Sequence, residues 1–399
     1  MKKLPFLSMS DINLSGRRVL LREDFNVPMV NGKIVHTEKI VRAIPTIQKA
    51  LKKSIQVIIL SHLGRPEEGR FDFSLSLAPI AETLSKKLKQ KIPLIANWLE
   101  GIPLELGTVV LCENVRFNIG ESRNDPSLSR IMAKLCDVFI MDAFATAHRV
   151  QASTVGIAKY APTACAGPLF ISEIKTLSRV VHNLKKPLVA ILGGAKISSK
   201  IHLLNSLLCT TDQLIVGGGI ANTFLKSTGY SVGKSLCEDS CLDRARQFLM
   251  TAKEKNVSVF LPVDVVVTHP SSRNRSNVVP TVKAVDKISN SESIFDIGPK
   301  TSERYTRLIA KAGSIVWNGP VGVFEIRDFS QGTRKLANAI ADSDAFSVAG
   351  GGDTLSALYK FKLADRISYT STGGGAFLEF LDGKTFPIIE VLMQQAKVL

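Results

Sequence analysis

The stretch LVAILGGAKISSK, residues 188–200, combines a buried-strand pattern with a glycine turn and two lysines. Five apolar residues lead into Gly193 and Gly194, and Lys196 and Lys200 follow one helical turn apart. This order predicts a strand, a phosphate-binding turn and a helix. The turn matches neither the G-x-x-x-x-G-K-[ST] phosphate loop nor the G-x-G-x-x-G dinucleotide turn. Its ligand therefore has to be inferred from the rest of the chain.

The same alternation of apolar run, turn and helical stretch recurs along the 399 residues. Such alternation predicts an α/β fold with parallel sheets covered by helices, and the length favours two domains. Apolar residues over 167–187 recur at helical spacing and end at Pro187, which predicts a helix that joins the domains. We therefore expect domains at 1–170 and 187–384, with an interdomain helix at 171–186.

Charged and polar side chains follow the predicted strands of the first half of the chain. Ligands of parallel sheets bind beyond the carboxyl ends of the strands, so these side chains should lie close together. They are Asp24, Asn26, His62, Arg65, Arg116, His148 and Arg149. Any one of the arginines is compatible with a surface salt bridge. Three guanidinium groups at matching strand exits predict a pocket for a small, multiply charged anion.

Glycine-rich turns follow the predicted strands of the second half. They lie at 193–194, 217–219, 350–352 and 373–375. One such turn is compatible with tight chain reversal alone, but four predict a backbone-lined site that suits a flat base and a polyphosphate. Lys196 and Lys200 can neutralise phosphates. Asp353 can hold Mg²⁺ or cap a helix beside Thr354, and Glu325 can bind ribose hydroxyls or be a surface acid.

The chain carries 51 Lys and Arg against 35 Asp and Glu, a formal charge of +16. This charge suits either nucleic acid or small anions. The strand-exit arginines occur one per loop, aromatic residues make up 7%, and the KKLKQK run at 86–91 is typical of a solvated helix face. These features argue against a nucleic-acid surface. Without a long apolar run or a signal peptide, we expect a cytoplasmic protein with no membrane partner. A monomer is also expected.

A dinucleotide-dependent dehydrogenase is disfavoured, because GGGIAN at 217–222 lacks the third glycine and no strand-ending acid follows about 20 residues on. An anion-binding domain and a nucleotide-binding domain instead predict phosphoryl transfer between a nucleotide and a small acid. Such transfer needs positioning, charge neutralisation and exclusion of water. Closure of two lobes about a hinge would exclude the water.

Eight segments resemble, in order, the motifs of the phosphoglycerate kinase family. They are LLREDFNVP, SHLGRP, ENVRF, DAFATAHR, GGAKISSK, WNGPVGVFE, AGGGDT and STGGGAFLE. The resemblance implies two Rossmann-like three-layer αβα domains joined by a hinge helix, with the C-terminal segment at about 385–399 folded back onto the first domain. It also implies a glycolytic activity, the reversible transfer between 1,3-bisphosphoglycerate with MgADP and 3-phosphoglycerate with MgATP, and Mg²⁺ as the cofactor.

The resemblance further implies which residues form the site. Phosphoglycerate would be bound by Asp24, Asn26, Lys39, His62, Leu63, Gly64, Arg65, Arg116 and Arg149. The nucleotide would be bound by Gly193, Lys196, Lys200, Asn318, Glu325, Gly351, Gly352, Asp353 and Thr354, with Asp353 also on the metal. Catalytic contacts to the moving phosphoryl group would come from Lys39, Lys200, Gly373 and Gly374. Because the nucleophile in the ATP-consuming direction is a carboxylate, already ionised near pH 7, no general base is expected.

The sequence departs from the family pattern at three positions. Lys39 stands where the family has an arginine; lysine keeps the charge but loses the planar fork, so we expect it to work at a reduced rate. Arg42, three residues on, is an alternative cation. Ala145 replaces a usual glycine, and Ser199 replaces a common aspartate. A second hypothesis is a family member whose basic surface binds a polyanion while Lys39 weakens catalysis, and salt-sensitive retention without turnover would favour it.

Overall fold

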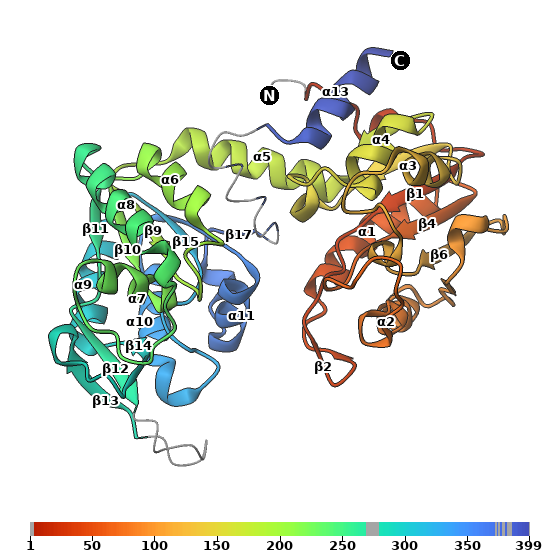
Figure 1. The fold of residues 1–399 in the computed structure, drawn as a ribbon. Helices are drawn as coiled ribbons and strands as arrows, with labels where there is room; N and C mark the ends of the chain where they lie inside the picture. The colour runs from red at the N-terminus through yellow and green to blue at the C-terminus, as the bar shows by residue number, and fades with distance from the viewer. Residues whose placement is uncertain are drawn as a thin grey trace. The chain divides into compact units, whose positions relative to one another are not determined.

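The computed structural model describes residues 4–268, 279–371, 373, 376, 380 and 385–398. The chain divides into two compact units. Unit 1 comprises Met1–Ser178 and Gly383–Leu399, and unit 2 comprises Arg179–Asp382. Each unit is built on a six-stranded parallel sheet with helices on its faces (Figure 1). The predicted α/β fold with αβα layers is therefore confirmed.

The sheet of unit 1 has the strand order β5-β6-β4-β1-β7-β8. Its strands are β1 (Arg18–Arg22), β4 (Gln56–Leu60), β5 (Leu94–Ile95), β6 (Thr108–Cys112), β7 (Val138–Met141) and β8 (Ala164–Ala166). Val19 of β1 lies beside Val57 of β4 and Val138 of β7, in parallel register. All five residues of β4 are buried, as expected for a strand covered on both faces. A separate hairpin pairs β2 (Met29–Val30) with β3 (Lys33–Ile34).

Helices cover the sheet of unit 1 because each has one apolar face. They are α1 (Glu38–Leu51), α2 (Ala78–Leu88), α3 (Pro126–Ala133), α4 (Ile157–Tyr160), α13 (Pro387–Val398) and the first part of α5 (Pro168–Asn183), whose residues from Arg179 on belong to unit 2. Short helical turns are η1 (Met9–Asp11), η2 (Phe73–Leu75), η3 (Trp98–Glu100), η4 (Val115–Phe117), η5 (Phe144–Thr146) and η6 (Ala152–Gly156). Helix α1 buries Ile40, Ala43 and Ile47, three or four residues apart, in one core with Val19 and Leu21 of β1. Helix α13 contacts α4 and β8 of this unit.

The main sheet of unit 2 has the order β11-β10-β9-β15-β16-β17. Its strands are β9 (Leu188–Leu192), β10 (Gln213–Val216), β11 (Ser258–Phe260), β15 (Ser314–Asn318), β16 (Phe346–Gly350) and β17 (Tyr369–Ser371). Val189 and Ile191 of β9 belong to one core cluster, whereas Ala190 and Leu192 belong to another. Successive side chains of a strand point to opposite faces, so these two clusters are the two interfaces of a three-layer domain.

Two groups of helices form the outer layers of unit 2. They are α6 (Ile201–Thr210), α7 (Gly218–Ser227) and α8 (Leu242–Glu254) on one side, and α9 (Pro299–Ile309), α10 (Gln331–Ala341) and α11 (Gly352–Phe361) on the other. Short helical turns are η7 (Asp239–Cys241), η8 (Val285–Lys287), η9 (Arg327–Phe329) and η10 (Ala364–Arg366). Phe224 and Phe248 line the first interface, and Tyr305 and Leu336 line the second.

Unit 2 also contains a three-stranded antiparallel sheet that the sequence analysis did not predict. It has the order β13-β12-β14, with β12 (Asp264–Thr268), β13 (Thr281–Ala284) and β14 (Ser293–Ile297). Contacts of β14 with α7 and α10 attach it to the domain. The helix expected at 171–186 is α5, which begins earlier, at Pro168, where proline suits a first helical position. In the part of the chain that the structure describes, no helix is long and apolar enough to cross a membrane.

Candidate active site

The residues predicted for the anion pocket follow four strands of unit 1, β6, β4, β1 and β7, which are neighbours in the sheet. Asp24 and Asn26 come after β1; His62, Leu63, Gly64 and Arg65 after β4; Arg116 in η4 after β6; and Arg149 after β7 and η5. Carboxyl ends of neighbouring parallel strands share one edge of the sheet. The fold therefore brings these residues to one edge, as predicted from the strand exits.

Lys39 contacts the β1 strand exit, which Asn26 connects to the β4 exit. Its ammonium lies 2.5 Å from Oδ2 of Asp24 and donates to the carbonyl of Asn26 at 3.2 Å. The Asn26 side-chain oxygen accepts the Gly64 N–H at 2.9 Å. Gly64 has φ of +62° and its Cβ would lie 2.5 Å from Leu75, so this turn needs glycine. Lys39 thus lies among the residues predicted to bind phosphoglycerate.

Arg42, the alternative cation on α1, has a different partner. Its guanidinium forms an ion pair with the buried carboxylate of Glu173 at 3.5 Å. Lys39, not Arg42, is therefore the α1 cation beside Asp24. Ala145 lies in η5 and has no positive φ, so the alanine that replaces a usual glycine is accommodated without strain.

Arg22, a site residue that the sequence analysis missed, lies fully buried behind His62. Its guanidinium donates to the Ser153 hydroxyl at 3.2 Å, to the Glu23 carbonyl, and to Nδ1 of His62 at 3.3 Å. Because an arginine can only donate, Nδ1 of His62 must accept, and Nε2 carries the proton. Arg22 is the last residue of β1, and this position could have indicated a role at the strand end. An arginine at the end of an apolar run is, however, easily assigned to the strand alone.

His62 is held as a neutral imidazole. Burial lowers its pKa well below the ordinary value, and the charges of Arg22, Arg116 and Arg149 lower it further. A neutral His62 with its proton on Nε2 offers one hydrogen-bond donor without an extra charge. Glu121, also missed in the sequence, accepts the Ser153 N–H at 2.9 Å and the Ser153 hydroxyl at 2.5 Å, and so orients the group that holds Arg22.

The arginines at the carboxyl edge of the unit 1 sheet repel one another, and this repulsion favours the binding of an anion there. Arg116 is only 8% exposed, and burial followed by the charges of Arg149 and Arg22 lowers its pKa to about 10. Its guanidinium donates to the carbonyl of Gly64. Arg65 is exposed, and Arg149 is half-buried, with its Nε 3.3 Å from Nε2 of His148. Like charges that depress one another's pKa favour a multiply charged anion between them.

Leu63 lies within the same turn but contributes backbone only. Its side chain is buried, and its carbonyl accepts the Asn114 amide at 2.8 Å. The same amide donates to the Leu75 carbonyl at 2.9 Å. Asn114 therefore fixes the turn that carries His62 and Gly64.

In unit 2 the glycine turns after β9 and β15 lie against each other. The Gly193 N–H donates to the Asn318 carbonyl at 2.9 Å, and the Gly194 N–H to the Pro320 carbonyl at 3.0 Å. A Cβ on Gly193 would lie 2.0 Å from the oxygen of Pro320. The close approach of two backbones explains why this strand ends in glycine.

The side chain of Lys200 lies where the turns after β9 and β15 meet. Its ammonium donates to the carbonyls of Gly193 at 2.6 Å and Asn318 at 3.3 Å. Burial lowers its pKa to about 8, although the carboxylate of Asp353 raises it. Lys196, by contrast, is exposed. The two lysines of the opening stretch therefore have different surroundings.

A second pair of turns, after β15 and β16, is tied together by side chains. The Asn318 amide donates to the Gly350 carbonyl at 2.6 Å, and the Thr354 hydroxyl accepts the Gly319 N–H at 2.7 Å. Gly351 has φ of +100°, and its Cβ would lie 2.7 Å from Nδ2 of Asn318. A Cβ on Gly352 would meet nothing within 4 Å, so its backbone faces open space.

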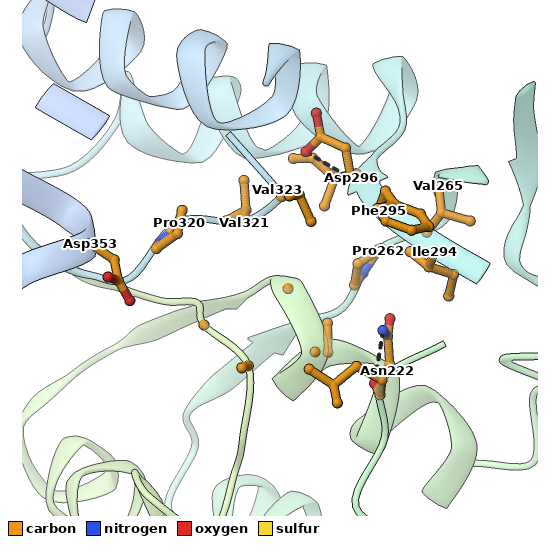
Figure 2. A pocket seen from close by; sticks show the side chains of 18 of the residues that line it. Asn222, Pro262, Val265, Ile294, Phe295, Asp296, Pro320, Val321, Val323 and Asp353 are labelled. Atoms are coloured by element: carbon orange, nitrogen blue, oxygen red, sulfur yellow. Dashed lines mark hydrogen bonds between the residues drawn. The ribbon is translucent and has the colours of Figure 1, made fainter. Parts of the chain in front are cut away.

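A pocket of about 310 Å³ in unit 2 lies beside these turns (Figure 2). Its apolar wall includes Leu236, Pro262, Val265, Ile294, Phe295 and Val323. Figure 2 shows Asp353 at the opposite end of the pocket from Phe295 and Ile294. Glu325 also lines it, together with glycines 194, 218 and 219. An apolar slot with a backbone-lined, polar end suits a base linked to phosphates.

Most residues of the apolar pocket wall were not predicted from the sequence. Val265, Ile294 and Phe295 come from the antiparallel strands β12 and β14, whose presence the parallel pattern did not indicate. Asp296 of β14 is buried and accepts hydrogen bonds from the N–H groups of Gly332 at 2.7 Å and Ile297 at 2.9 Å. Burial raises its pKa to about 7.

Asp353 fits a divalent cation better than a helix cap. It is the second residue of α11, and the cap position belongs to Gly351. Its carboxylate is exposed toward the pocket, while Thr354 takes the backbone hydrogen bond. Among the described residues no group of three His, Cys, Asp or Glu could hold a metal ion. One exposed carboxylate beside glycine turns with accessible backbone is compatible with Mg²⁺, which takes few protein carboxylates and fills its remaining positions with water and phosphate oxygens.

The remaining predicted residues are placed only in part. The Gly373 N–H donates to the Ser371 hydroxyl at 3.1 Å at the end of β17. Gly374 lies outside the described residues. The predicted residues that the structure describes form two groups, one on each unit.

Comparison with known proteins gives a consistent result across nearly the whole chain. The family model described as phosphoglycerate kinase matches residues 9–384. A phosphoglycerate kinase of Coxiella burnetii (strain RSA 493 / Nine Mile phase I) is 62% identical over 98% of this chain and 99% of its own, and one of Legionella pneumophila (strain Paris) is 52% identical over 98% of each.

Two solved structures agree with the sequence comparison. The structure of phosphoglycerate kinase from Coxiella burnetii has a TM-score of 0.82 at 62% identity, covering 98% of this chain and 100% of that chain. The crystal structure of the enzyme from Pyrococcus horikoshii OT3 has a TM-score of 0.83 at 31% identity, covering 98% and 99%. The chain therefore belongs to the phosphoglycerate kinase family.

Proposed function

We propose that the two units divide the phosphoglycerate kinase reaction, with unit 1 holding the phosphoglycerate and unit 2 the nucleotide. Family membership makes the chain a glycolytic phosphotransferase that acts on a carboxyl acceptor. The observation that carries the division is the contrast between the two strand-end groups. Unit 1 gathers buried and half-buried cations, whereas unit 2 offers glycine backbone around an apolar slot. Cations bind a small acid phosphate, and backbone with an apolar wall binds a nucleotide.

Within unit 1, Arg65, Arg116 and Arg149 would hold the phosphate and carboxyl groups of the acid. Neutral His62 would donate from Nε2, with Arg22 fixing its tautomer. Asp24 and Asn26 would receive the hydroxyl of the acid, and the main chain of Leu63 and Gly64 would shape the turn. Lys39 would supply positive charge beside the reacting carboxylate. None of these groups needs to remove a proton, because a carboxylic acid is ionised at neutral pH.

Within unit 2, Lys196 and Lys200 would neutralise the nucleotide phosphates, and Gly193, Gly351 and Gly352 would let the main chain approach them. Asn318 and Thr354 would keep the turns in place, and Glu325 would bind the ribose. Gly373 and Gly374 would direct amides at the moving phosphoryl group. Asp353 would hold Mg²⁺, which when bound shields the charge of the phosphate oxygens.

Closure of the two units about a hinge helix stays a prediction, as do the domain boundaries taken from the sequence. We also propose that the chain acts as a monomer in the cytoplasm and has no nucleic-acid partner. The support is that both residue groups come from one chain, that glycolytic substrates are small and soluble, and that the strand-end cations are partly buried rather than arranged as a stripe.

Ligand-induced thermal shifts of two variants test the division directly. Stability gained from a ligand depends on its affinity for the folded state. Arg116→Met should abolish the increase in Tm caused by 3-phosphoglycerate and keep the increase caused by MgADP, and Lys196→Met should do the reverse. Arg307→Met, which removes an exposed arginine of α9 that pairs with Glu303, is the matched control and should keep both shifts. A variant that loses both shifts equally, with its own Tm unchanged, would contradict the division.

A further inference from the structure

The carboxylate of Glu238 accepts hydrogen bonds from the turn between Lys196 and Lys200. Its Oε2 accepts the Ser198 N–H at 2.9 Å, and its Oε1 accepts the Ser198 hydroxyl at 2.6 Å. The backbone N–H of Ile197 also donates to it. Burial raises the pKa of this carboxyl, but the hydrogen bonds from Ser198 and Ile197 outweigh burial and lower it below the ordinary value. Glu238 is therefore an ionised acceptor for three donors of the turn.

The loop that carries Glu238 is itself anchored to α7. The Glu238 N–H donates to the Thr223 hydroxyl at 3.2 Å, and the Asn222 amide donates to the Leu236 carbonyl at 3.1 Å. Leu236 and Asn222 line the nucleotide pocket. The loop thus connects the pocket wall to the lysine turn, which are far apart in the sequence.

The turn needs such an anchor because its own bonds are few. Residues 197–200 precede the first turn of α6, where backbone N–H groups lack helical partners. Lys200, at the cap position of α6, makes no side-chain cap. Within the turn, the Ser199 hydroxyl donates to the Lys196 carbonyl at 2.8 Å, and the Lys200 N–H donates to the Ile197 carbonyl at 2.9 Å. A carboxylate from outside the turn is then the group that satisfies its exposed amides.

We propose that Glu238 is a positioning residue for the nucleotide phosphates, holding the turn from which Lys196 and Lys200 reach them. Glu238 contacts the turn and not the substrate. The proposal rests on the phosphate-binding role proposed above for the two lysines.

A charge effect of Glu238 would have the opposite sign. Its carboxylate interacts with the charge of Lys196 and is negative, so on charge alone it would repel phosphates. Removing it would then lower the KM for MgATP. If Glu238 positions the turn, removing it frees the lysines and raises that KM. The direction of the change therefore separates the two effects.

Steady-state kinetics of the full-length protein test the proposal with Glu238→Ala, Glu238→Gln and Ser198→Ala. Glu238→Ala should lower kcat/KM for MgATP about tenfold, mainly through KM, and leave the KM for 3-phosphoglycerate within about twofold. Ser198→Ala removes one hydroxyl and should raise the KM for MgATP about threefold. Glu238→Gln has no charge but can still pair with Ser198, so it should lie between Glu238→Ala and the unsubstituted protein.

Asp239→Asn is the matched control, because the adjacent acid pairs with exposed Lys226 and not with the turn. It should leave both KM values unchanged. Lys196→Met separates the two proposals. If it raises the KM for MgATP and Glu238→Ala does not, the positioning role is wrong and the phosphate role stands. If neither variant changes that KM, both are wrong.

A lower KM for MgATP in Glu238→Ala would show a charge effect and overturn the proposal. Glu238→Ala could also fold poorly, and Ser198→Ala then decides. An unchanged KM for MgATP in Ser198→Ala, with unchanged Tm, would overturn the positioning role. A lower Tm in Glu238→Ala or Glu238→Gln with both KM values unchanged would mean that Glu238 only stabilises the fold, and would overturn the proposal as well.

Discussion

The ammonium of Lys200 lies 2.6 Å from the carbonyl oxygen of Gly193, within the glycine turn that follows β9. A second carbonyl, that of Asn318, lies 3.3 Å away. The lysine is therefore held by neutral oxygens of the two adjoining turns, and burial lowers its pKa to about 8. Its charge is present at neutral pH but is lost at a lower pH than that of an exposed lysine.

Activity should fall at alkaline pH because Lys200 loses its proton. The free enzyme's ionisations control kcat/KM, so kcat/KM for MgATP should fall about tenfold per pH unit above about pH 8. Lys200→Arg keeps the charge at every accessible pH and should remove this decline, whatever its effect on the maximal rate. A profile of the unsubstituted protein that stays flat to about pH 9.5 would contradict the role of Lys200.

Glu23 and Asp142 form a buried pair of carboxyl groups at the ends of β1 and β7. The two side chains share a hydrogen bond, and the Phe170 N–H at the start of α5 donates to Asp142 at 2.9 Å. Burial raises the pKa of Asp142 to about 6. Burial, followed by the charge of Asp142, raises the pKa of Glu23 well above the ordinary value. The folded protein therefore keeps protons that the unfolded chain has released.

The contribution of this pair to stability should consequently decrease as the pH rises from about 5 to 8, whereas His62, whose pKa folding lowers, acts in the opposite direction. A carboxyl whose pKa is raised by folding stabilises the protein below its unfolded pKa, and this stabilisation is lost as the pH passes the folded pKa. Glu23→Gln removes one titrating group, so from pH 5 to pH 8 the unsubstituted protein should lose stability relative to Glu23→Gln. Urea denaturation at pH 5 and pH 8 measures the slopes, with exposed Glu67→Gln as the control. Equal slopes for Glu23→Gln and the unsubstituted protein would contradict the shared proton.

Gly193 and Gly352 should respond differently to alanine. A Cβ on Gly193 would lie 2.0 Å from the Pro320 oxygen, so Gly193→Ala should lower the free energy of unfolding by about 1–3 kcal/mol. A Cβ on Gly352 meets nothing within 4 Å, so Gly352→Ala should keep the stability. Because a nucleotide phosphate would approach that backbone, Gly352→Ala should still raise the KM for MgATP. Thermal denaturation and kinetics of both variants check this, and an unchanged KM in Gly352→Ala would argue against a close approach.

The sequence predicted the parallel sheets well, because strands covered on both faces read as continuous apolar runs, as in β4 and β9. The strand-end rule then predicted that Asp24, His62 and Arg116 share one edge of the sheet. Some roles, such as phosphate binding by Lys196 and Lys200, were inferred from the residues themselves, and others came from the resemblance to a family; all of them remain predictions.

Other parts of the site depend on contacts that no local pattern encodes. Arg22 looks like the end of a strand, and its role beside His62 depends on Ser153, which lies 131 residues away along the chain. The antiparallel strands β12 and β14 supply Val265 and Phe295 to the pocket, but short apolar runs do not reveal whether strands pair in parallel or antiparallel. Glu238 likewise reaches Ser198 across 40 residues.

We expect positively charged groups, with a lysine in the place of the family arginine, to support the transfer without a general base. Removing Lys39 would take away a positive charge and leave the Asp24 carboxylate without this ion pair, so we expect a large decrease in activity. The most direct measurement is steady-state turnover of 3-phosphoglycerate with MgATP by the unsubstituted protein, Lys39→Arg and Lys39→Ala.

We predict that the unsubstituted protein turns over, that Lys39→Ala lowers kcat about 100-fold, as expected for loss of a charge that stabilises the transition state, and that Lys39→Arg raises kcat. A Lys39→Ala variant with an unchanged kcat, or no turnover by the unsubstituted protein together with turnover by Lys39→Arg, would contradict the claim.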